Sequence, residues 1–387
     1  MRNSITDVWR FMGYRIRRHT YPFTMMPINV TVSVTNRCNS RCRTCYIWNM
    51  YHESPELQKT ELELWEFDKI FKSLGKSVKY LVLSGGEPFL RKDLAGICAS
   101  AYEHCQPHVI TIPTNALLPK VIENELKHIL SVCRGTSFTV NLSLDGVGDK
   151  HDEIRGVKGN FESFKDTYNM LLQMKKEFPN LIVGVHSVLS VFNLDNFTET
   201  YNFVRKLQPD SYITEVAEER TELFNQGNQV TPNPLKLESL LSILRENIKR
   251  DYLSKGGFLS RLIQASRLEY YETVPKILES KRQLQPCYAG FASCQITPYG
   301  DIWPCCVLGY TQSMGNLREH EYEFRRVWFS ERAQGIRRYV NNGNCSCPLA
   351  NAWYTSTFCN MGHAVKITAT LLASYLQRSK TPMHEKD

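Results

Sequence analysis

The sequence of 387 residues has no apolar run that approaches the length of a membrane-spanning helix, and its first residues lack the uninterrupted apolar core of a signal peptide. It also has no low-complexity tract and no internal repeat. Lysine and arginine are scattered without a long basic run, so we expect no nucleic-acid partner despite the net charge of +8. These absences leave an ordinary globular protein, which we expect in the cytoplasm.

Cysteine, in contrast, is abundant. Thirteen cysteines, odd in number and clustered, are typical of metal ligation in a reducing compartment rather than of a disulfide scaffold. Cys38, Cys42 and Cys45 form a short loop directly after the alternating β-branched run 28–34. Thiolates are soft ligands, so an iron–sulfur cluster and zinc are the candidates. With no fourth Cys or His nearby, one coordination position stays open, and an open position is typical of chemistry rather than of a structural zinc site.

The spacing Cys38-x3-Cys42-x2-Cys45, followed by Tyr46, resembles the signature loop of the radical S-adenosylmethionine (SAM) superfamily. The resemblance implies a [4Fe–4S] cluster on the three Cys, with SAM chelating the fourth iron. It also implies a low-potential electron donor, a flavodoxin or a ferredoxin, that reduces this cluster. SAM is then cleaved to methionine and a 5′-deoxyadenosyl radical, which takes a hydrogen atom from a substrate.

Further segments resemble the SAM-binding motifs of this superfamily. After the second β-run, Gly85 and Gly86 let the backbone approach a ligand and Glu87 is suited to accept hydrogen bonds from the SAM ammonium. The guanidinium fork of Arg155 matches the SAM carboxylate, as in the family. Taken alone, these features have plainer interpretations as turns or as a solvated arginine. The residues expected to contact SAM are Tyr46, Ser84, Gly85, Gly86, Glu87, Pro88, Thr114, Asn115, Ser143, Asp145, Arg155 and Asn193, and Ala116 stands where the family has Gly.

Six β-runs alternate with helical patterns between residues 27 and about 216, which predicts parallel strands with right-handed crossovers. Curled, these strands would form the α/β fold that the resemblance implies, a partial (βα)6 barrel with ligands at the carboxyl ends of its strands. The six runs are 28–34, 78–84, 109–112, 138–144, 182–189 and 212–216.

We expect five segments along the chain. Residues 1–26 predict a basic amphipathic helix with an aromatic face, which either packs under the first domain or lies on a membrane surface as a peripheral contact. The radical SAM core is expected over 27–220 and a helical bridge over 221–286. An auxiliary cluster domain over 287–360 and a terminal helix with its tail over 361–387 complete the chain.

The second cysteine-rich segment begins with Cys287, Gly300 and Cys305, whose spacing resembles the opening of the SPASM/twitch extension, a β-hairpin-plus-helix domain. The resemblance implies one auxiliary [4Fe–4S] cluster on Cys287, Cys305, Cys345 and Cys347. Cys345 and Cys347 depart from the family, because one residue separates them where two are usual. Cys306 and Cys359 are alternative ligands, and a structural zinc on the same thiols is the competing interpretation.

The expected function is hydrogen abstraction from a small molecule or a lipid-linked compound, with the auxiliary cluster assisting an oxidation. The basic N-terminal helix favours this substrate class, and no stretch resembles a leader-peptide-binding domain. A peptide or protein maturase of the SPASM type is the alternative. A non-catalytic iron–sulfur or zinc protein is a further alternative, which explains the cysteines but not the 84–88 motif or Arg155.

Overall fold

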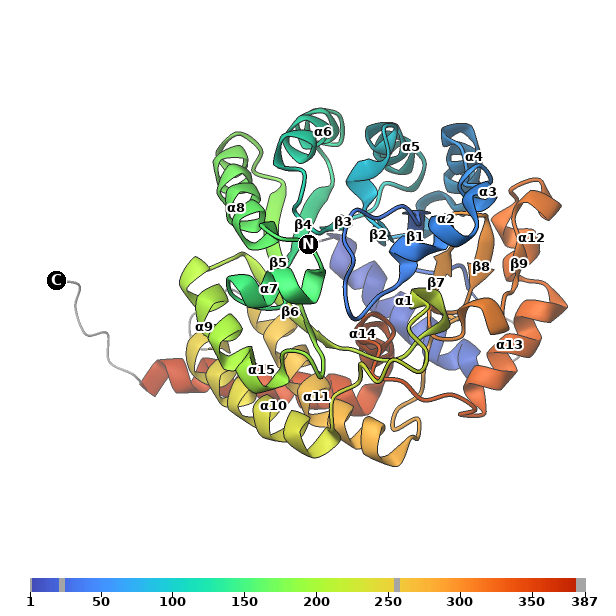
Figure 1. Cartoon of the computed structure of the whole chain (residues 1–387). Helices are drawn as coiled ribbons and strands as arrows, with labels where there is room; N and C mark the ends of the chain where they lie inside the picture. The colour runs from blue at the N-terminus through green and yellow to red at the C-terminus, as the bar shows by residue number, and fades with distance from the viewer. Residues whose placement is uncertain (1, 21–24, 254–257, 381–387) are drawn as a thin grey trace.

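The computed structural model describes residues 2–20, 25–253 and 258–380. Its centre is one nine-stranded sheet with the strand order β6-β5-β4-β3-β2-β1-β7-β8-β9. All neighbouring pairs from β6 to β7 are parallel. This confirms the predicted curled α/β sheet (Figure 1). The six barrel strands are β1 (Asn29–Thr35), β2 (Tyr80–Gly85), β3 (Val109–Thr114), β4 (Ser137–Ser143), β5 (Leu181–Leu189) and β6 (Ser211–Val216).

The two faces of this sheet differ in chemistry. Side chains such as Leu81, Leu83, Ile110 and Ile112 are buried in the main apolar core that the outer helices complete. Each such side chain contributes roughly 1.5–3 kcal/mol of burial energy. Because side chains alternate along a strand, the neighbouring positions face the inside of the curl, and there the sequence places polar groups. They include Ser33, Ser84, Asn141, Ser143, His186 and Glu215.

Helices follow most strands and cover the outside of the curl (Figure 1). Helix α4 shows how they begin: Glu63 caps its N-terminus in a reciprocal pair with Glu66, and its apolar side buries Phe67 and Phe71. The helices of this part are α2 (Met50–Glu53), α3 (Pro55–Gln58), α4 (Leu64–Leu74), α5 (Leu94–Cys105), α6 (Pro119–Val132), α7 (Asp149–Arg155), α8 (Asn160–Glu177) and α9 (Phe197–Leu207).

The predicted β-hairpin of the second cysteine-rich segment is confirmed, but it does not form a sheet of its own. Strand β7 (Ser293–Ile296) pairs in parallel with β1, with Thr31 opposite Gln295. Strands β8 (Asp301–Trp303) and β9 (Gly315–Asn316) then extend the sheet in antiparallel fashion. The hairpin therefore continues the barrel sheet at its β1 edge, which no sequence pattern indicated.

The remaining helices pack around the β6 and β7 sides. Helix α10 packs on α11 in the segment expected to be a helical bridge, and α11 also contacts α14 and α15. These helices are α10 (Pro234–Ile248), α11 (Phe258–Ser280), α12 (Phe324–Trp328), α13 (Glu331–Asn341), α14 (Ala350–Cys359) and α15 (Met361–Lys380).

The N-terminal helix α1 (Arg2–His19) lies behind the strands in the view of Figure 1 and packs on α14. Tyr14 is buried and donates a hydrogen bond of 2.6 Å to the carbonyl of Met26, and Arg10 donates one of 2.7 Å to Ser77. On another side of the helix, Trp9 and Ile16 are 72% and 60% exposed. The helix therefore packs under the barrel and still presents apolar side chains to solvent.

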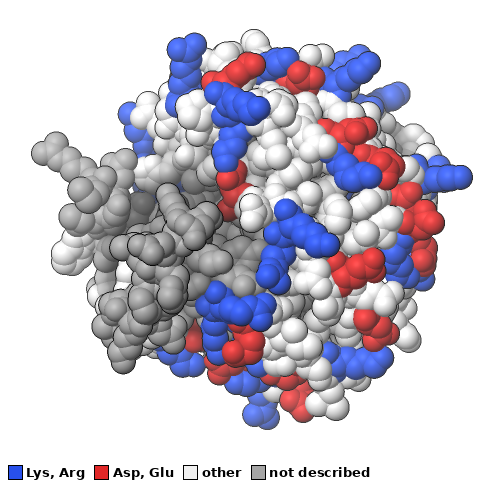
Figure 2. Space-filling view, turned by 90° about the vertical axis from the view of Figure 1, so that its left-hand side faces the viewer, with Lys and Arg blue, Asp and Glu red and all other residues white. Residues whose placement is uncertain are grey.

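None of the helices in the described ranges is both long and apolar enough to cross a membrane. On the side of the molecule shown in Figure 2, Lys and Arg are interspersed with Asp and Glu rather than gathered into one basic patch.

Candidate functional site

The three-cysteine loop runs across the carboxyl ends of the strands. The Asn39 amide oxygen accepts a hydrogen bond of 2.7 Å from Asn115, beyond the end of β3. The backbone N–H of Arg41 donates to the carbonyl of Arg155 at 3.0 Å, and that of Tyr46 donates to the carbonyl of Leu223 at 2.8 Å. The loop is thus fixed to several neighbouring strand ends in turn, which holds its thiols over the polar interior of the curl.

Side chains of this loop alternate between buried and exposed positions. Cys42 is buried and Cys38 and Cys45 are half-buried. Burial, followed by neighbouring thiols, raises the pKa of Cys45 to about 12, and burial raises that of Cys38 to about 11. Both would be protonated without a positive partner, so a thiolate here requires a metal or another cation. The exposed residues that flank and separate these cysteines are Arg37, Asn39, Arg41 and Arg43.

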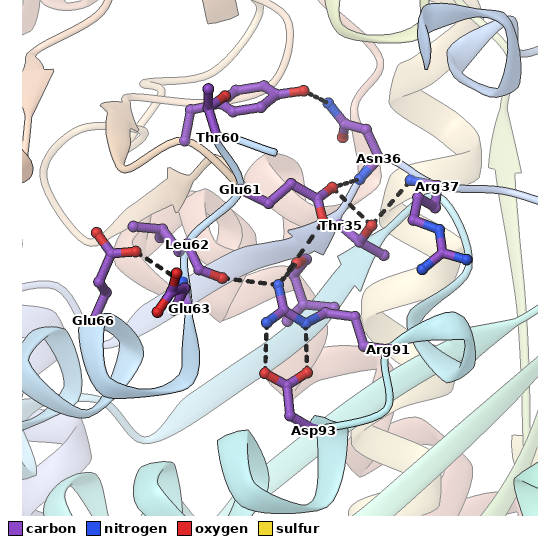
Figure 3. Close-up of polar contacts among 12 residues, drawn as sticks. Thr35, Asn36, Arg37, Thr60, Glu61, Leu62, Glu63, Glu66, Arg91 and Asp93 are labelled. Carbon is purple, nitrogen blue, oxygen red and sulfur yellow. Dashed lines mark hydrogen bonds and ion pairs between the residues drawn. The ribbon is translucent and has the colours of Figure 1, made fainter. Parts of the chain in front are cut away.

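The root of the loop is braced by two charged residues that the sequence did not single out, Glu61 and Arg91 (Figure 3). Glu61 accepts hydrogen bonds from the Thr35 hydroxyl at 2.7 Å and from the Asn36 N–H at 2.8 Å. Arg91 donates to the Val34 carbonyl at 2.8 Å. The same guanidinium forms a two-pronged pair with Asp93, next to a surface groove of about 950 Å³ that Arg37 also lines. These residues carry no motif, and only their contacts identify them.

Packing against the protein's own backbone already requires Gly85 and Gly86, whatever their expected contact with SAM. A Cβ on Gly86 would lie 2.1 Å from the carbonyl oxygen of Arg37, and one on Gly85 would lie 2.0 Å from that of Thr35. The glycines therefore let the cysteine loop approach β2. Ser84 ends this strand half-buried on its polar face, and Pro88 begins the short helical turn that follows.

The Glu87 carboxylate is engaged by three protein groups. Its oxygens accept hydrogen bonds from the Asn115 N–H at 2.7 Å, the Thr114 hydroxyl at 2.9 Å and the Phe89 N–H at 3.2 Å. Burial raises the pKa of Glu87 to about 7 although these three bonds oppose the shift. The side chain therefore joins the ends of β2 and β3, and its direct contact with the SAM ammonium stays a prediction. Thr114 and Asn115 take part in the same network.

Asp145 is likewise engaged by the protein. One oxygen accepts from the Val188 N–H at 2.8 Å, and the other lies 3.1 Å from an Arg155 amine nitrogen. Asp145 therefore orients Arg155, and its expected ribose contact stays a prediction. Arg155 keeps a buried Nε without a hydrogen-bond partner among the described residues. Burial opposes its charge, but Cys42 and Asp145 hold the pKa of Arg155 above its ordinary value.

The three remaining residues expected to contact SAM, Asn193, Ser143 and Tyr46, lie in different surroundings. The Asn193 amide donates to the Asp145 and Val188 carbonyls at 2.9 and 2.8 Å, and its expected adenosine contact stays a prediction. Ser143 is half-buried beside His186, and its hydroxyl has no hydrogen bond within the described chain. Tyr46 is half-buried, with its ring 6.2 Å from that of Trp48.

The four auxiliary cysteines lie together. Cys287, Cys345 and Cys347 line one small cavity of about 40 Å³. Burial and then the neighbouring Cys287 thiol raise the pKa of Cys305, and Cys345 contributes as well. Cys359, one of the two alternative ligands, packs instead in an apolar cluster with Tyr14, Tyr288 and Phe291. The sulfur of Cys306 lies 3.0 Å from the guanidinium nitrogen Nη1 of Arg220.

Both cysteine sets suit a multi-iron cluster better than one ion. Within the described ranges, no three His, Cys, Asp or Glu side chains converge closely enough to hold a single metal ion. An iron–sulfur cluster takes each thiolate on a different iron, so its ligands surround a volume rather than a point. The unpartnered Nε of Arg155 beside Cys42 and Cys38 also fits a carboxylate held at the open position.

Comparison with protein families gives two matches. Residues 32–204 match the model of the Radical SAM superfamily, and residues 287–348 match SPASM, an iron–sulfur cluster-binding domain. Together these segments include all the cysteines of the two sets described above.

Individual relatives agree with these two family matches. The chain is 24% identical to the antilisterial bacteriocin subtilosin biosynthesis protein AlbA of Bacillus subtilis, over 81% of this chain and 63% of AlbA, so it spans less than two thirds of that relative. It is 25% identical to the AdoMet-dependent heme synthase of Methanosarcina barkeri, over 81% of this chain and 85% of that protein. The crystal structure of Streptococcus suis SuiB bound to S-adenosylmethionine shares the fold, with a TM-score of 0.59 at 17% identity, over 85% of this chain and 72% of SuiB.

Proposed function

Because the chain belongs to the radical SAM superfamily and carries a SPASM domain, we propose that it abstracts a hydrogen atom from a substrate held in the polar interior of its barrel. The bound [4Fe–4S] cluster and SAM supply the one-electron cleavage that gives a 5′-deoxyadenosyl radical, and an auxiliary cluster supplies an electron acceptor. The observation that carries the proposal is the Arg155 guanidinium beside Cys38 and Cys42, whose buried Nε has no hydrogen-bond partner among the described residues.

The chain's own residues hold these groups and keep them oriented. Cys38, Cys42 and Cys45 are the proposed ligands of the first cluster, and Arg155 is the proposed partner of the SAM carboxylate. Asp145 fixes the guanidinium from one side, which leaves Nε directed to the ligand. Ser143 offers a free hydroxyl for the ribose. Cys287, Cys305, Cys345 and Cys347 are the proposed ligands of the auxiliary cluster.

The direct test is anaerobic reconstitution followed by incubation with SAM and dithionite. We expect 5′-deoxyadenosine from the wild-type chain and none from Cys42→Ala, together with about eight irons per chain for two clusters. A matched control is Cys98→Ala, because Cys98 is a buried core thiol away from both sets. A protein that binds iron but never forms 5′-deoxyadenosine would support the non-catalytic alternative.

Two substrate classes are supported by different relatives. Similarity to the heme synthase supports a small molecule, the class expected from the sequence together with lipid-linked compounds. Similarity to AlbA, a bacteriocin biosynthesis protein, supports a peptide substrate equally well. Incubating the reconstituted protein with either class and measuring 5′-deoxyadenosine above the substrate-free rate separates them.

An acidic electron donor, a flavodoxin or a ferredoxin, is the proposed partner. The exposed guanidinium groups of Arg37 and Arg41 lie on the same short loop as the thiols, and neither has an ion-pair partner within the described ranges. Charge complementarity at this surface would steer an acidic protein to it. Arg37→Glu with Arg41→Glu should slow flavodoxin-driven turnover and leave dithionite-driven turnover unchanged. Equal loss with both reductants would contradict the docking surface.

Peripheral membrane contact is proposed for the outer side of α1. Trp9 and Ile16 are exposed there, with Arg15 and Arg17 on the same helix. Co-sedimentation with anionic vesicles should fall in Trp9→Ser with Ile16→Ser. The buried Tyr14 face stays intact in this variant, so unchanged partitioning would argue against membrane contact rather than report misfolding.

A further inference from the structure

The end of β6 and the segment 217–225 that follows it place three carboxylates around one largely buried guanidinium. Arg220 Nη2 lies 3.4 Å from Glu215 Oε1, Nε lies 3.5 Å from Glu218 Oε1, and Nη1 lies 3.9 Å from Glu222 Oε2. Figure 1 shows this yellow-green segment running from β6 across the middle of the view toward β7. We call Glu215, Glu218, Arg220 and Glu222 the carboxylate cluster.

The carboxylate cluster lies between the two sets of thiols. On one side, the Tyr46 N–H beside Cys45 donates to the carbonyl of Leu223, the residue after Glu222, at 2.8 Å. On the other side, Arg220 Nη1 lies 3.0 Å from the sulfur of Cys306, in the second cysteine-rich segment. Glu222 also accepts a hydrogen bond from Gln295 on β7, the strand that joins the hairpin to the barrel. A substrate that uses both cofactor sites would therefore pass this cluster.

The charges of the cluster do not balance. Three carboxylates share one guanidinium, which leaves two negative charges over when all are ionised. His186 lies 3.5 Å from Glu215, and even with a charge on His186 one negative charge would remain without a partner. Buried charge without a partner is costly, so the arrangement favours an additional cation.

Glu218 shows where that cation is missing. It is only 6% exposed, and its Oε1 has no hydrogen-bond partner within the described chain, because the contact with Arg220 is too long or misaligned to be one. Burial raises the pKa of Glu218 to about 7, and although Arg220 opposes this shift, Glu215 and Glu222 reinforce it. Arg220 Nε, 3.5 Å away, also lacks a hydrogen bond among the described residues, so the two groups do not satisfy each other and Glu218 Oε1 can accept from a further donor.

We propose that the carboxylate cluster binds a cationic group of the substrate, an amine or a guanidinium. This inference rests on the function proposed above and narrows its substrate. A substrate that presented carboxylates here would add negative charge beside three carboxylates that share one guanidinium. An ammonium or guanidinium instead supplies both the missing charge and the missing donor.

The test measures binding of three small probes to the reconstituted full chain with SAM present, by titration calorimetry. The probes are N-acetyl-lysine N-methylamide and its norleucine and glutamate counterparts. We expect the lysine probe to bind at least roughly tenfold more tightly than the others, and Glu218→Gln to weaken it roughly tenfold, because a charge-assisted hydrogen bond is lost. Glu219→Gln is the matched control, since Glu219 is exposed and bonds only to the Gly227 N–H.

Several outcomes would overturn the proposal: no binding of the lysine probe, equal binding of the norleucine probe, tighter binding of the glutamate probe, or no effect of Glu218→Gln. The affinity for SAM is measured in parallel, because an equal loss in Glu218→Gln would assign the carboxylates to SAM instead. Absence of 5′-deoxyadenosine from the wild-type chain would refute the enzymatic function. Loss of probe selectivity while SAM is still cleaved would refute the cation site alone.

Discussion

Replacing Gly86 by Ala tests whether the cysteine loop depends on its close approach to β2. The backbone of Gly86 has no left-handed φ, so the substitution probes space rather than backbone strain. The added Cβ would lie 2.1 Å from the carbonyl oxygen of Arg37 and 2.6 Å from its carbon, whereas ordinary contact begins near 3.4 Å. Both atoms belong to the backbone, so the loop has to move by more than an ångström.

The expected cost follows from what this movement breaks. The Glu87 N–H donates to the Arg37 carbonyl at 2.7 Å, and the Gly86 N–H donates to the Thr35 carbonyl at 2.8 Å. Loss of one or both bonds costs about 1 kcal/mol each, and overpacking adds about 1–3 kcal/mol. We therefore expect Gly86→Ala to lower the free energy of unfolding by about 2–5 kcal/mol and to reduce the iron bound by the three-cysteine loop.

Urea denaturation and iron analysis of the reconstituted chain measure the two effects. Gly335→Ala is the matched control, because Gly335 lies within α13 and its nearest neighbour is the end of the Arg338 side chain at 3.8 Å. Alanine in a helix interior should raise the unfolding free energy by about 1 kcal/mol. If Gly86→Ala stayed within about 0.5 kcal/mol of wild type and bound the same iron, the packing argument would be refuted.

Three further predictions follow from single contacts. Ala116 has a φ of 64°, which disfavours any residue with a side chain. Ala116→Gly should therefore raise the free energy of unfolding, measured in urea, by about 1 kcal/mol, and a loss of stability would contradict this. Arg155→Lys should weaken SAM binding about tenfold in calorimetry at unchanged iron content, because a single ammonium replaces the fork; unchanged affinity would remove Arg155 from the SAM site. Glu218 has a pKa of about 7 in the folded chain against an ordinary value of 4.5. Between these two pH values only the unfolded chain ionises the carboxyl, so the free energy of unfolding falls as pH rises, by about 3 kcal/mol in total. Glu218→Gln should flatten that part of the stability–pH curve, and an unchanged slope would place the carboxyl in a less buried setting.

The strands and the position of the cysteine loop were predictable because both depend on local pattern. Alternation of apolar and polar residues marks a strand with two different faces, and a loop that follows such a strand must lie at its carboxyl end. The four auxiliary thiols were also predictable as one group, because resemblance to a family supplies their spacing. Boundaries at 27–220 and 287–360 remain predictions, since the shared sheet gives no natural break between the two parts.

The partners of individual side chains were not predictable. Sequence motifs identified Glu87, Asp145 and Asn193, but a motif gives the residue type and not the hydrogen bonds that residue makes. In the structure all three are engaged by protein groups. The charged residues of 217–225 resemble a solvated loop in sequence, because nothing local indicates that Arg220 and Glu218 are buried together.

The segment 217–225 also connects the proposed substrate group to the cysteine loop. Asn225 is fully buried, and its amide donates to the Thr44 carbonyl at 2.8 Å and to the Glu218 carbonyl at 3.1 Å. Thr44 directly precedes Cys45, and Glu218 belongs to the carboxylate cluster. One side chain therefore bonds to the backbone of both, which ties the position of the carboxylate cluster to that of a proposed cluster ligand. Cys38 is placed by other contacts, because its neighbours are held by Glu61 and Asn115.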